Sequence, residues 1–131
     1  MENEPEIIKQ PTPLDILIAD AMNVETLMEA EIKTSGNTNP WPARLRSRLT
    51  AIGGCLGLLL EKDPDNIKLV AIQTLFDGIN KEVNDKQEAL EREGQKLGDD
   101  SFSPEQKAGL IVQVKLIGKL ANKLSTKQIS R

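Results

Sequence analysis

Apolar residues recur at helical spacing along four long segments of this chain, and a common start signal precedes each of them. The signal is a polar capping residue followed by proline, which suits the first helical position because proline has no backbone N–H to leave unsatisfied. It occurs at Thr12–Pro13, Asn39–Pro40, Asp63–Pro64 and Ser103–Pro104. The pattern therefore predicts an all-α fold built from four main helices.

The predicted helices are expected to form one domain. They cover about residues 13–33, 42–62, 64–96 and 104–128. The connections between them are short, which favours antiparallel packing of neighbouring helices. We predict a single helical-bundle domain over residues 12–131, mostly antiparallel, preceded by a flexible acidic segment over residues 1–11.

The third predicted helix is the longest, and its C-terminal part is sparsely hydrophobic. We expect its last three turns either to project beyond the bundle or to meet a partner. Val83, Leu90 and Leu97 are seven residues apart, a spacing that would suit a short coiled-coil contact with a partner. A simply exposed helix end is the alternative.

The second predicted helix holds the most apolar run of the chain together with three glycines within five residues. Each interior glycine costs up to about 1 kcal/mol relative to alanine, so a compensating contact is expected. A second backbone approaching Gly53 and Gly57, on either side of Leu56, would supply it. A tight crossing within the monomer is the favoured interpretation, and a homodimer seam is the alternative.

Net charge alternates along the chain. The protein carries −3 overall, yet residues 1–33 carry −6, residues 34–62 carry +3, residues 63–100 carry −5 and residues 101–131 carry +5. Such blocks can attract one another within a compact fold. The alternative is that the two basic blocks meet on one side of the molecule and bind a polyanion.

Two sets of cations are the polyanion-binding candidates. One set occupies the first turns of the second helix, where the helix dipole disfavours positive charge: Arg44, Arg46 and Arg48. The other follows the fourth helix: Lys115, Lys119, Lys123 and Lys127. If the two helices are neighbours, these side chains could line one groove.

The arginines need an anionic partner. Glu25, Glu29 and Glu31 of the first helix could supply it through internal ion pairs, which is the favoured interpretation, and a phosphate backbone is the alternative. Trp41 beside the arginines could stack on a base or contact a partner. A lone tryptophan between two prolines more often closes the end of a bundle.

Catalytic and metal-site chemistry has little support in this sequence. Histidine is absent, which removes the commonest general base and the usual zinc ligand. The single cysteine, Cys55, lies in an apolar run and is expected to be a small core residue with a raised pKa. No glycine motif for nucleotide phosphates is present. We therefore predict a protein that is not an enzyme, with no metal and no cofactor.

Signals for membrane insertion or secretion are not found either. The longest apolar run, residues 49–60, is shorter than the roughly 20 residues that a membrane span needs. The N-terminal residues are acidic, whereas a secretory signal begins basic and apolar. Together with the single cysteine, these features favour a cytoplasmic protein of the producing or infected cell.

Two functions fit these features. The favoured one is a non-catalytic interaction or adaptor subunit that oligomerises or docks on protein partners, on the strength of the glycine-bearing apolar helix. The alternative is a nucleic-acid-binding accessory subunit that uses the basic faces of the second and fourth helices. The size and layout are similar to those of small helical subunits of nucleoprotein assemblies, such as CRISPR effector small subunits or phage packaging adaptors. This likeness concerns layout only, and no motif transfers residue roles.

Overall fold

The computed structural model describes residues 11–35 and 40–129, with backbone alone at 31, 32, 34, 35 and 125–129. Within these residues all regular structure is helical, as the sequence predicts. The α-helices are α1 (Pro13–Met22), α2 (Val24–Ser35), α3 (Trp41–Lys62), α4 (Ile67–Arg92) and α5 (Pro104–Ile129), and a 3-10 helix, η1, spans Asp99–Ser101. The acidic segment predicted at 1–11 and the capping residue Asn39 lie, apart from Pro11, outside the described residues.

Two of the predicted start signals form capping boxes. At α1, the Asp15 N–H donates to the Thr12 hydroxyl at 3.1 Å, and the Thr12 N–H donates back to the Asp15 carboxylate at 3.1 Å. At α5, the Gln106 N–H donates to the Ser103 hydroxyl at 3.1 Å, and the Ser103 N–H donates to the Gln106 side chain at 2.9 Å. Each box satisfies two backbone donors that a helix start would leave unpaired.

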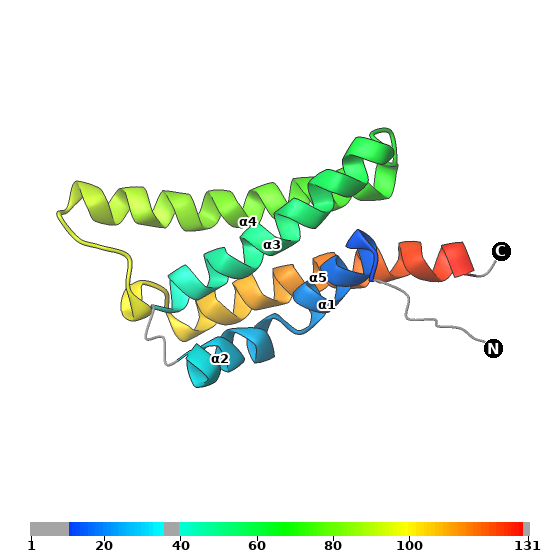
Figure 1. The fold of residues 1–131 in the computed structure, drawn as a ribbon. Coiled ribbons are helices and arrows are strands. Elements are labelled where there is room, and N and C mark those ends of the chain that lie inside the picture. Colours follow the sequence, from blue (N-terminus) through cyan, green and yellow to red (C-terminus); the bar gives the residue numbers. More distant parts are fainter. Residues whose placement is uncertain (1–10, 36–39, 130–131) are drawn as a thin grey trace.

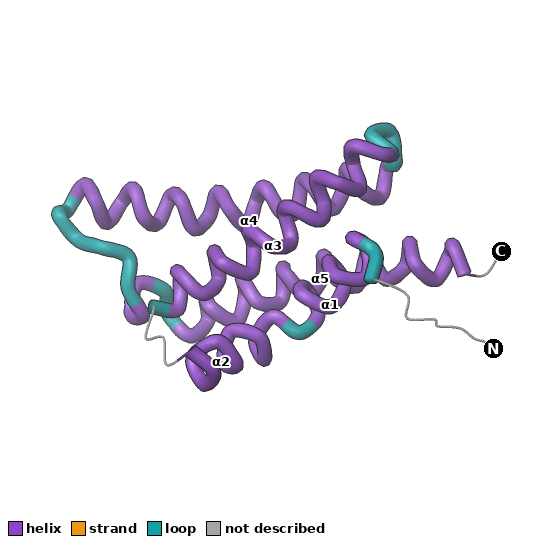
Figure 2. The backbone as a smooth tube through the Cα atoms, in the orientation of Figure 1, coloured by secondary structure: helices purple, strands orange, loops and turns teal. Residues whose placement is uncertain are grey.

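The first predicted helix is divided into α1 and α2 at Asn23, so the prediction of one continuous helix over 13–33 is wrong (Figure 2). Asn23 has φ −109° and ψ 23°, and its backbone N–H donates to the Ala19 carbonyl at 3.0 Å. Its side-chain amide donates to the same carbonyl at 3.1 Å. An asparagine side chain that competes with the backbone in this way disfavours a continuous helix.

The start of α4 lies three residues beyond the predicted one at Pro64. Asn66 caps the helix, because its side-chain oxygen accepts from the N–H groups of Lys68 at 3.0 Å and Leu69 at 3.2 Å. Asp63 instead ends α3, with its N–H donating to the Leu59 carbonyl at 3.0 Å. Both residue types are good helix caps. In the tight turn between the two helices, Asp63 ends α3 and Asn66 begins α4.

The end of α4 lies four residues before the predicted one. Gly94 has φ +72°, a conformation that glycine adopts without steric cost. The Gln95 N–H donates to the Leu90 carbonyl at 2.8 Å, and the Gly94 N–H donates to the Glu91 carbonyl at 3.0 Å. These two bonds form a Schellman motif. With this end, α4 and α5 each have 26 residues. The helix predicted to be the longest therefore shares that length with α5.

The helices pack together around one aliphatic core. α1 packs on α3 and α5, and α4 packs on α5 and α3 (Figure 1). Each of these helices contributes fully buried side chains, for example Leu17, Ile52, Ile72 and Ile117. The C-terminal end of α4 extends beyond the start of α3 in Figure 1, and the segment 93–103 returns from it to α5.

The glycine that lies against the backbone of another helix is not one of those that the sequence suggested. A Cβ atom at Gly53 would lie 2.7 Å from the Phe76 ring of α4, so this glycine accommodates a side chain of the same chain. At Gly57 no atom lies within 4 Å of such a Cβ, and Leu56 is fully buried. At Gly118 of α5, by contrast, a Cβ would lie 3.0 Å from the backbone N of Met22. The tight crossing is therefore between α1 and α5.

Candidate functional site

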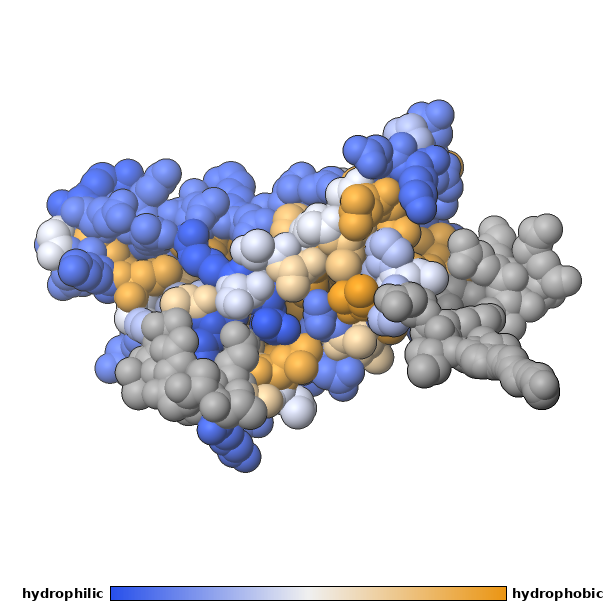
Figure 3. Space-filling view, in the orientation of Figure 1, coloured by the Kyte–Doolittle hydropathy of each residue, from blue (hydrophilic) through white to orange (hydrophobic). Residues whose placement is uncertain are grey.

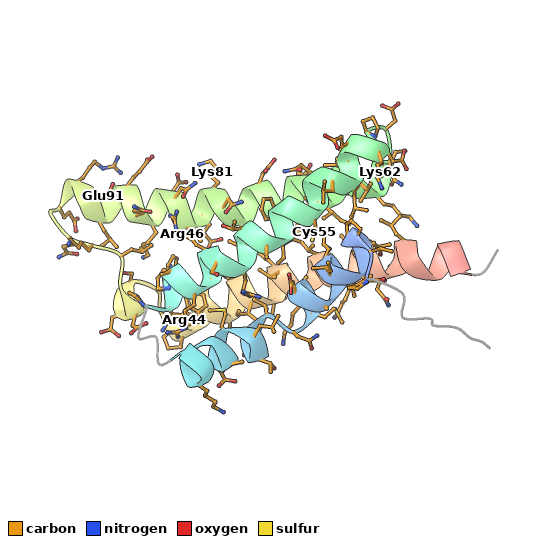
Figure 4. The ribbon with its side chains drawn as sticks, in the orientation of Figure 1. Arg44, Arg46, Cys55, Lys62, Lys81 and Glu91 are labelled. Atoms are coloured by element: carbon orange, nitrogen blue, oxygen red, sulfur yellow. The ribbon has the colours of Figure 1, made fainter. Side chains whose placement is uncertain are left out.

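The three arginines at the start of α3 do not share one side of that helix, and Figure 4 shows Arg44 and Arg46 on different sides of it. Arg44 and Arg48 are four residues apart and share a face, whereas Arg46 lies about half a turn away from both. Arg46 faces α4, where its Nη2 donates to the side-chain oxygens of Asn84 at 2.9 Å and Gln87 at 2.5 Å. Arg48 faces α1, with its Nη1 3.9 Å from the Asp20 carboxylate. The arginines therefore do not form a single cluster.

The acids of α2 lie among cations of two other helices. The Lys115 ammonium of α5 donates to the Glu25 carboxylate at 2.8 Å. Arg44 lines a hollow of about 250 Å³ together with Glu25, Glu29 and Trp41. Of the expected anionic partners of the arginines, Glu25 and Glu29 are thus near Arg44, and the Glu31 side chain lies outside the described ones. This arrangement fits internal charge complementarity between α2, α3 and α5.

The basic side chains of α5 are spread along the length of that helix. Lys107, near the start of α5, has its ammonium 5.5 Å from the centre of the Trp41 ring, so the start of α5 lies beside the start of α3. Lys123 is sixteen residues farther along, or about 24 Å at the rise of an α-helix. Lys119 and Lys123 are exposed, and the Lys127 side chain is outside the described part. The described residues do not place the arginines and these lysines in one groove.

One end of the molecule is closed by aromatic side chains. Phe102, next to η1, is only 3% exposed, and its ring centre lies 5.8 Å from that of Trp41. Asp99 of η1 accepts the Trp41 backbone N–H and so caps α3 from 58 residues away. Ammonium groups lie over both rings at 5.5 Å, Lys107 over Trp41 and Lys86 over Phe102. Trp41 therefore packs at this end, which we call the closed end.

The proposed coiled-coil stripe is contradicted by the structure. Val83 is 1% exposed and belongs to the core of its own chain. Leu90 lies in the last turns of α4, but Leu97 follows the Gly94 turn and is no longer helical. Because α4 ends at Arg92, these residues cannot continue one helical stripe, and Leu97 packs against the core instead.

The opposite end carries exposed apolar side chains on the α3–α4 hairpin. Ile67 is 84% exposed, Leu58 is 51% exposed and Val70 is 47% exposed. We call these three residues the hairpin tip patch. Figure 3 shows hydrophobic and pale surface over the C-terminal part of α3, while the C-terminal half of α4 is hydrophilic.

A hollow of about 210 Å³ lies at this same end. Its apolar walls come from four helices, and its polar lining comes from the last residue of α3 and two residues of the turn that follows. The lining residues are Leu14, Leu59, Leu69, Leu124, Lys62, Asp63 and Asn66. Leu58, Ile67 and Val70 are not among its lining residues. Exposed apolar surface is the kind of surface that marks interaction sites. We refer to the hairpin tip patch and this hollow as the open end.

The sequence prediction treated the apolar run of the second helix as a whole, did not single out Leu58, and missed the patch. A signal was nevertheless present, because Leu58, Leu59 and Leu60 are consecutive in a helix and successive side chains point about 100° apart. One of the three must therefore turn away from the core. Ile67 gave no such signal, because its place directly after the capping residue Asn66 is known only from the structure.

Cys55 is partly buried, and burial raises the pKa of its thiol, with the nearby Asp20 carboxylate adding to the shift. The raised pKa agrees with the prediction from its apolar surroundings. A thiol of this kind is mostly protonated at neutral pH and is a poor nucleophile. Among the described residues, no three side chains of His, Cys, Asp or Glu are grouped so that they could hold a metal ion.

No described helix combines the length and the apolar character needed to cross a membrane. No protein-family model matches the chain, and the comparisons with curated proteins and with solved structures found no match. The function must therefore be argued from the residues and surfaces described above.

Proposed function

We propose that this protein is a non-catalytic helical interaction module that associates with a second copy through its open end. The observation that carries the proposal is the hairpin tip patch, in which Ile67, Leu58 and Val70 are about half or more exposed. Burying apolar surface is the main favourable term in protein association. Covering three large aliphatic side chains next to one hairpin turn would therefore contribute favourable free energy to association.

A second copy is the partner that suits the charges around the patch. Residues 61–68 carry three acids and two lysines, so the patch has a mixed rim with a net charge of −1. Two copies related by a two-fold axis can set Lys62 and Lys68 of one against Asp63 and Asp65 of the other. The C-terminal part of α4 is more strongly acidic, and it would repel its own copy.

The contact is expected to be weak. Three aliphatic side chains per copy contribute a few kcal/mol of burial energy, and the loss of translational and rotational freedom opposes it. We therefore expect a dissociation constant in the range of roughly micromolar to millimolar. The module would associate reversibly in the absence of other partners.

Sedimentation equilibrium over a wide concentration range tests the proposal. The wild type should show a rising average mass at high concentration, and the double variant Ile67→Lys/Val70→Lys should remain a monomer because buried charge opposes association. The matched control is Val112→Lys/Leu116→Lys, which changes two exposed apolar residues of α5 and should associate like the wild type.

Three outcomes would contradict the proposal. The first is a wild type that stays monomeric throughout, and the second is equal loss of association in both double variants. The third is an association that the hairpin tip variant leaves unchanged. Circular dichroism of all three proteins checks that the helices are retained.

Binding of nucleic acid is the weaker proposal. It rests on the exposed Lys119 and Lys123 of α5, while Lys115 is already paired with Glu25 and Arg46 with α4. Salt-dependent binding to DNA or RNA that is lost in Lys119→Ala/Lys123→Ala would favour it.

A further inference from the structure

A groove of about 430 Å³ lies beside the closed end, where the start of α3 meets the last turns of α4. The segment that follows α4 forms its third side. Its lining residues are Pro42, Ala43, Arg46, Gln87, Glu91, Lys96 and Leu97. Figure 4 shows Arg46 on the α4 side of α3 and Glu91 near the end of α4. The groove is separate from the hairpin tip patch.

Arg46 is held in this groove by neutral groups. Its hydrogen bonds to described residues run from one nitrogen, Nη2, to the amide oxygens of Asn84 and Gln87. The Gln87 amide nitrogen donates in turn to the Glu91 carboxylate at 3.1 Å, which orients the Gln87 oxygen toward Arg46. The two amide oxygens hold the guanidinium in place without neutralising its positive charge. The donors on Nε and Nη1 stay available for a ligand.

Lys96 supplies a second cation from the other wall. It lies just after the Gly94 turn that ends α4, next to the partly buried Leu97. Glu91 is the one acid among the lining residues, so Arg46 and Lys96 leave the groove with a net charge of +1. Pro42, Ala43 and Leu97 give it apolar walls. Ligand sites commonly combine apolar walls with a few fixed polar groups.

We propose that this groove binds a small organic anion, a carboxylate or phosphate group attached to an apolar body. Arg46 holds the anionic group through its planar set of donors, and Lys96 contributes a second charge. The apolar body lies against Pro42 and Leu97. The neutral Asn84 and Gln87 serve as positioning residues, because they orient Arg46 without competing as anions.

Titrations of the full chain with three aromatic probes test this site. Benzoate and phenyl phosphate carry the two anionic groups, and benzyl alcohol is a neutral analogue of similar size. Amide chemical shifts should change at Ala43, Lys96 and Leu97, with dissociation constants of roughly 1 mM for whichever anion binds. The difference between benzoate and phenyl phosphate identifies the preferred group, and benzyl alcohol should bind at least about tenfold more weakly.

Matched variants separate the site from general charge effects. Arg46→Met should weaken binding by about tenfold or more, and Arg46→Lys should restore only part of it because the fork of donors is lost. Lys81→Met removes an exposed cation elsewhere on α4, which pairs with Asp85, and should leave binding unchanged. Ile67→Lys/Val70→Lys should also bind normally, so the anion site and the proposed self-association can fail independently.

The proposal is overturned by any of three results. The first is that no amide shifts change in the groove up to about 20 mM probe, which is far above the expected dissociation constant. The second is that benzyl alcohol binds as tightly as the anions. The third is that Arg46→Met and Lys81→Met weaken anion binding equally. If Arg46→Met alters the fold, Lys96→Met and Arg46→Lys are measured instead. The proposal is also overturned if both of these variants bind the anion with the affinity of the wild type.

Discussion

The two ends of the molecule differ in how their apolar side chains are covered. At the closed end, the segment 93–103 folds back, so Phe102 is buried and Trp41 packs beside it. Asp99 of the same segment caps α3. At the open end, a four-residue turn joins α3 to α4, and among the described residues no comparable segment covers Ile67. The length of the connection thus decides which end is sealed by its own chain.

The two ends therefore differ in whether they can take part in association. A long connection between helices can carry an aromatic side chain and a cap back onto the helix ends, whereas a short turn cannot. The open end keeps its apolar residues on the surface, where another protein can cover them. The closed end should therefore matter for stability and the open end for association.

The largest expected effect is the loss of Phe102. We expect Phe102→Ala to lower the free energy of unfolding by about 3–5 kcal/mol, because it removes a buried aromatic side chain and leaves a cavity. Ile67→Ala should change it by less than about 0.5 kcal/mol, since an exposed side chain loses little burial. Urea unfolding followed by circular dichroism measures both, and similar effects would remove the distinction between the ends.

The next effect compares two helical glycines, one that lies against a neighbouring helix and one with no atom close to it. Gly118→Ala should destabilise the protein by about 1–3 kcal/mol, because the new Cβ would lie 3.0 Å from the Met22 backbone N. Gly57→Ala, with no atom within 4 Å, should stabilise it by up to about 1 kcal/mol. Thermal and urea unfolding of the pair check the opposite signs, and destabilisation by both would show that α3 is covered at Gly57.

The smallest effect concerns the cap of α3. Asp99→Ala should cost about 1 kcal/mol, as for other helix caps, and should speed hydrogen exchange at the Trp41 amide that Asp99 accepts. Asp100→Ala is the neighbouring control and should change neither quantity appreciably. If the Trp41 amide exchanges equally in both variants, the long-range cap does not hold the closed end.

Local signals in the sequence account for the parts of the fold that depend on neighbouring residues. Thr12 and Ser103 begin α1 and α5 through capping boxes that a four-residue pattern reveals. The helical spacing of apolar residues along the four segments fits the buried positions that the structure shows, for example Leu17 and Ile117. The all-α class follows from these signals alone, because helical periodicity and caps are both short-range.

The errors arise where several local signals compete or where distant residues meet. Asp63 and Asn66 are both good caps, and only packing decides which one starts α4. An asparagine can lie inside a helix or interrupt it, so the residue type of Asn23 does not by itself predict the break between α1 and α2. The cap of α3 by Asp99 spans 58 residues, and no pattern in a single sequence reveals such a pair.

The candidate sites follow the same division. The sequence identified Arg44, Arg46 and Arg48 as cations that need partners, but their spacing already places Arg46 on another face of the helix. Their actual neighbours on α1, α2 and α4 depend on how the helices pack. The hairpin tip patch was missed because apolar residues were assigned to the core by periodicity alone.

Hydrogen–deuterium exchange at low and high protein concentration tests the difference between the two ends most directly. If copies associate through the open end, amides around Leu58 and from Ile67 to Val70 should exchange more slowly at high concentration. Amides of η1 and the first turn of α5 should exchange at the same rate at both concentrations. Slower exchange at the closed end, or no change at either end, would contradict the account.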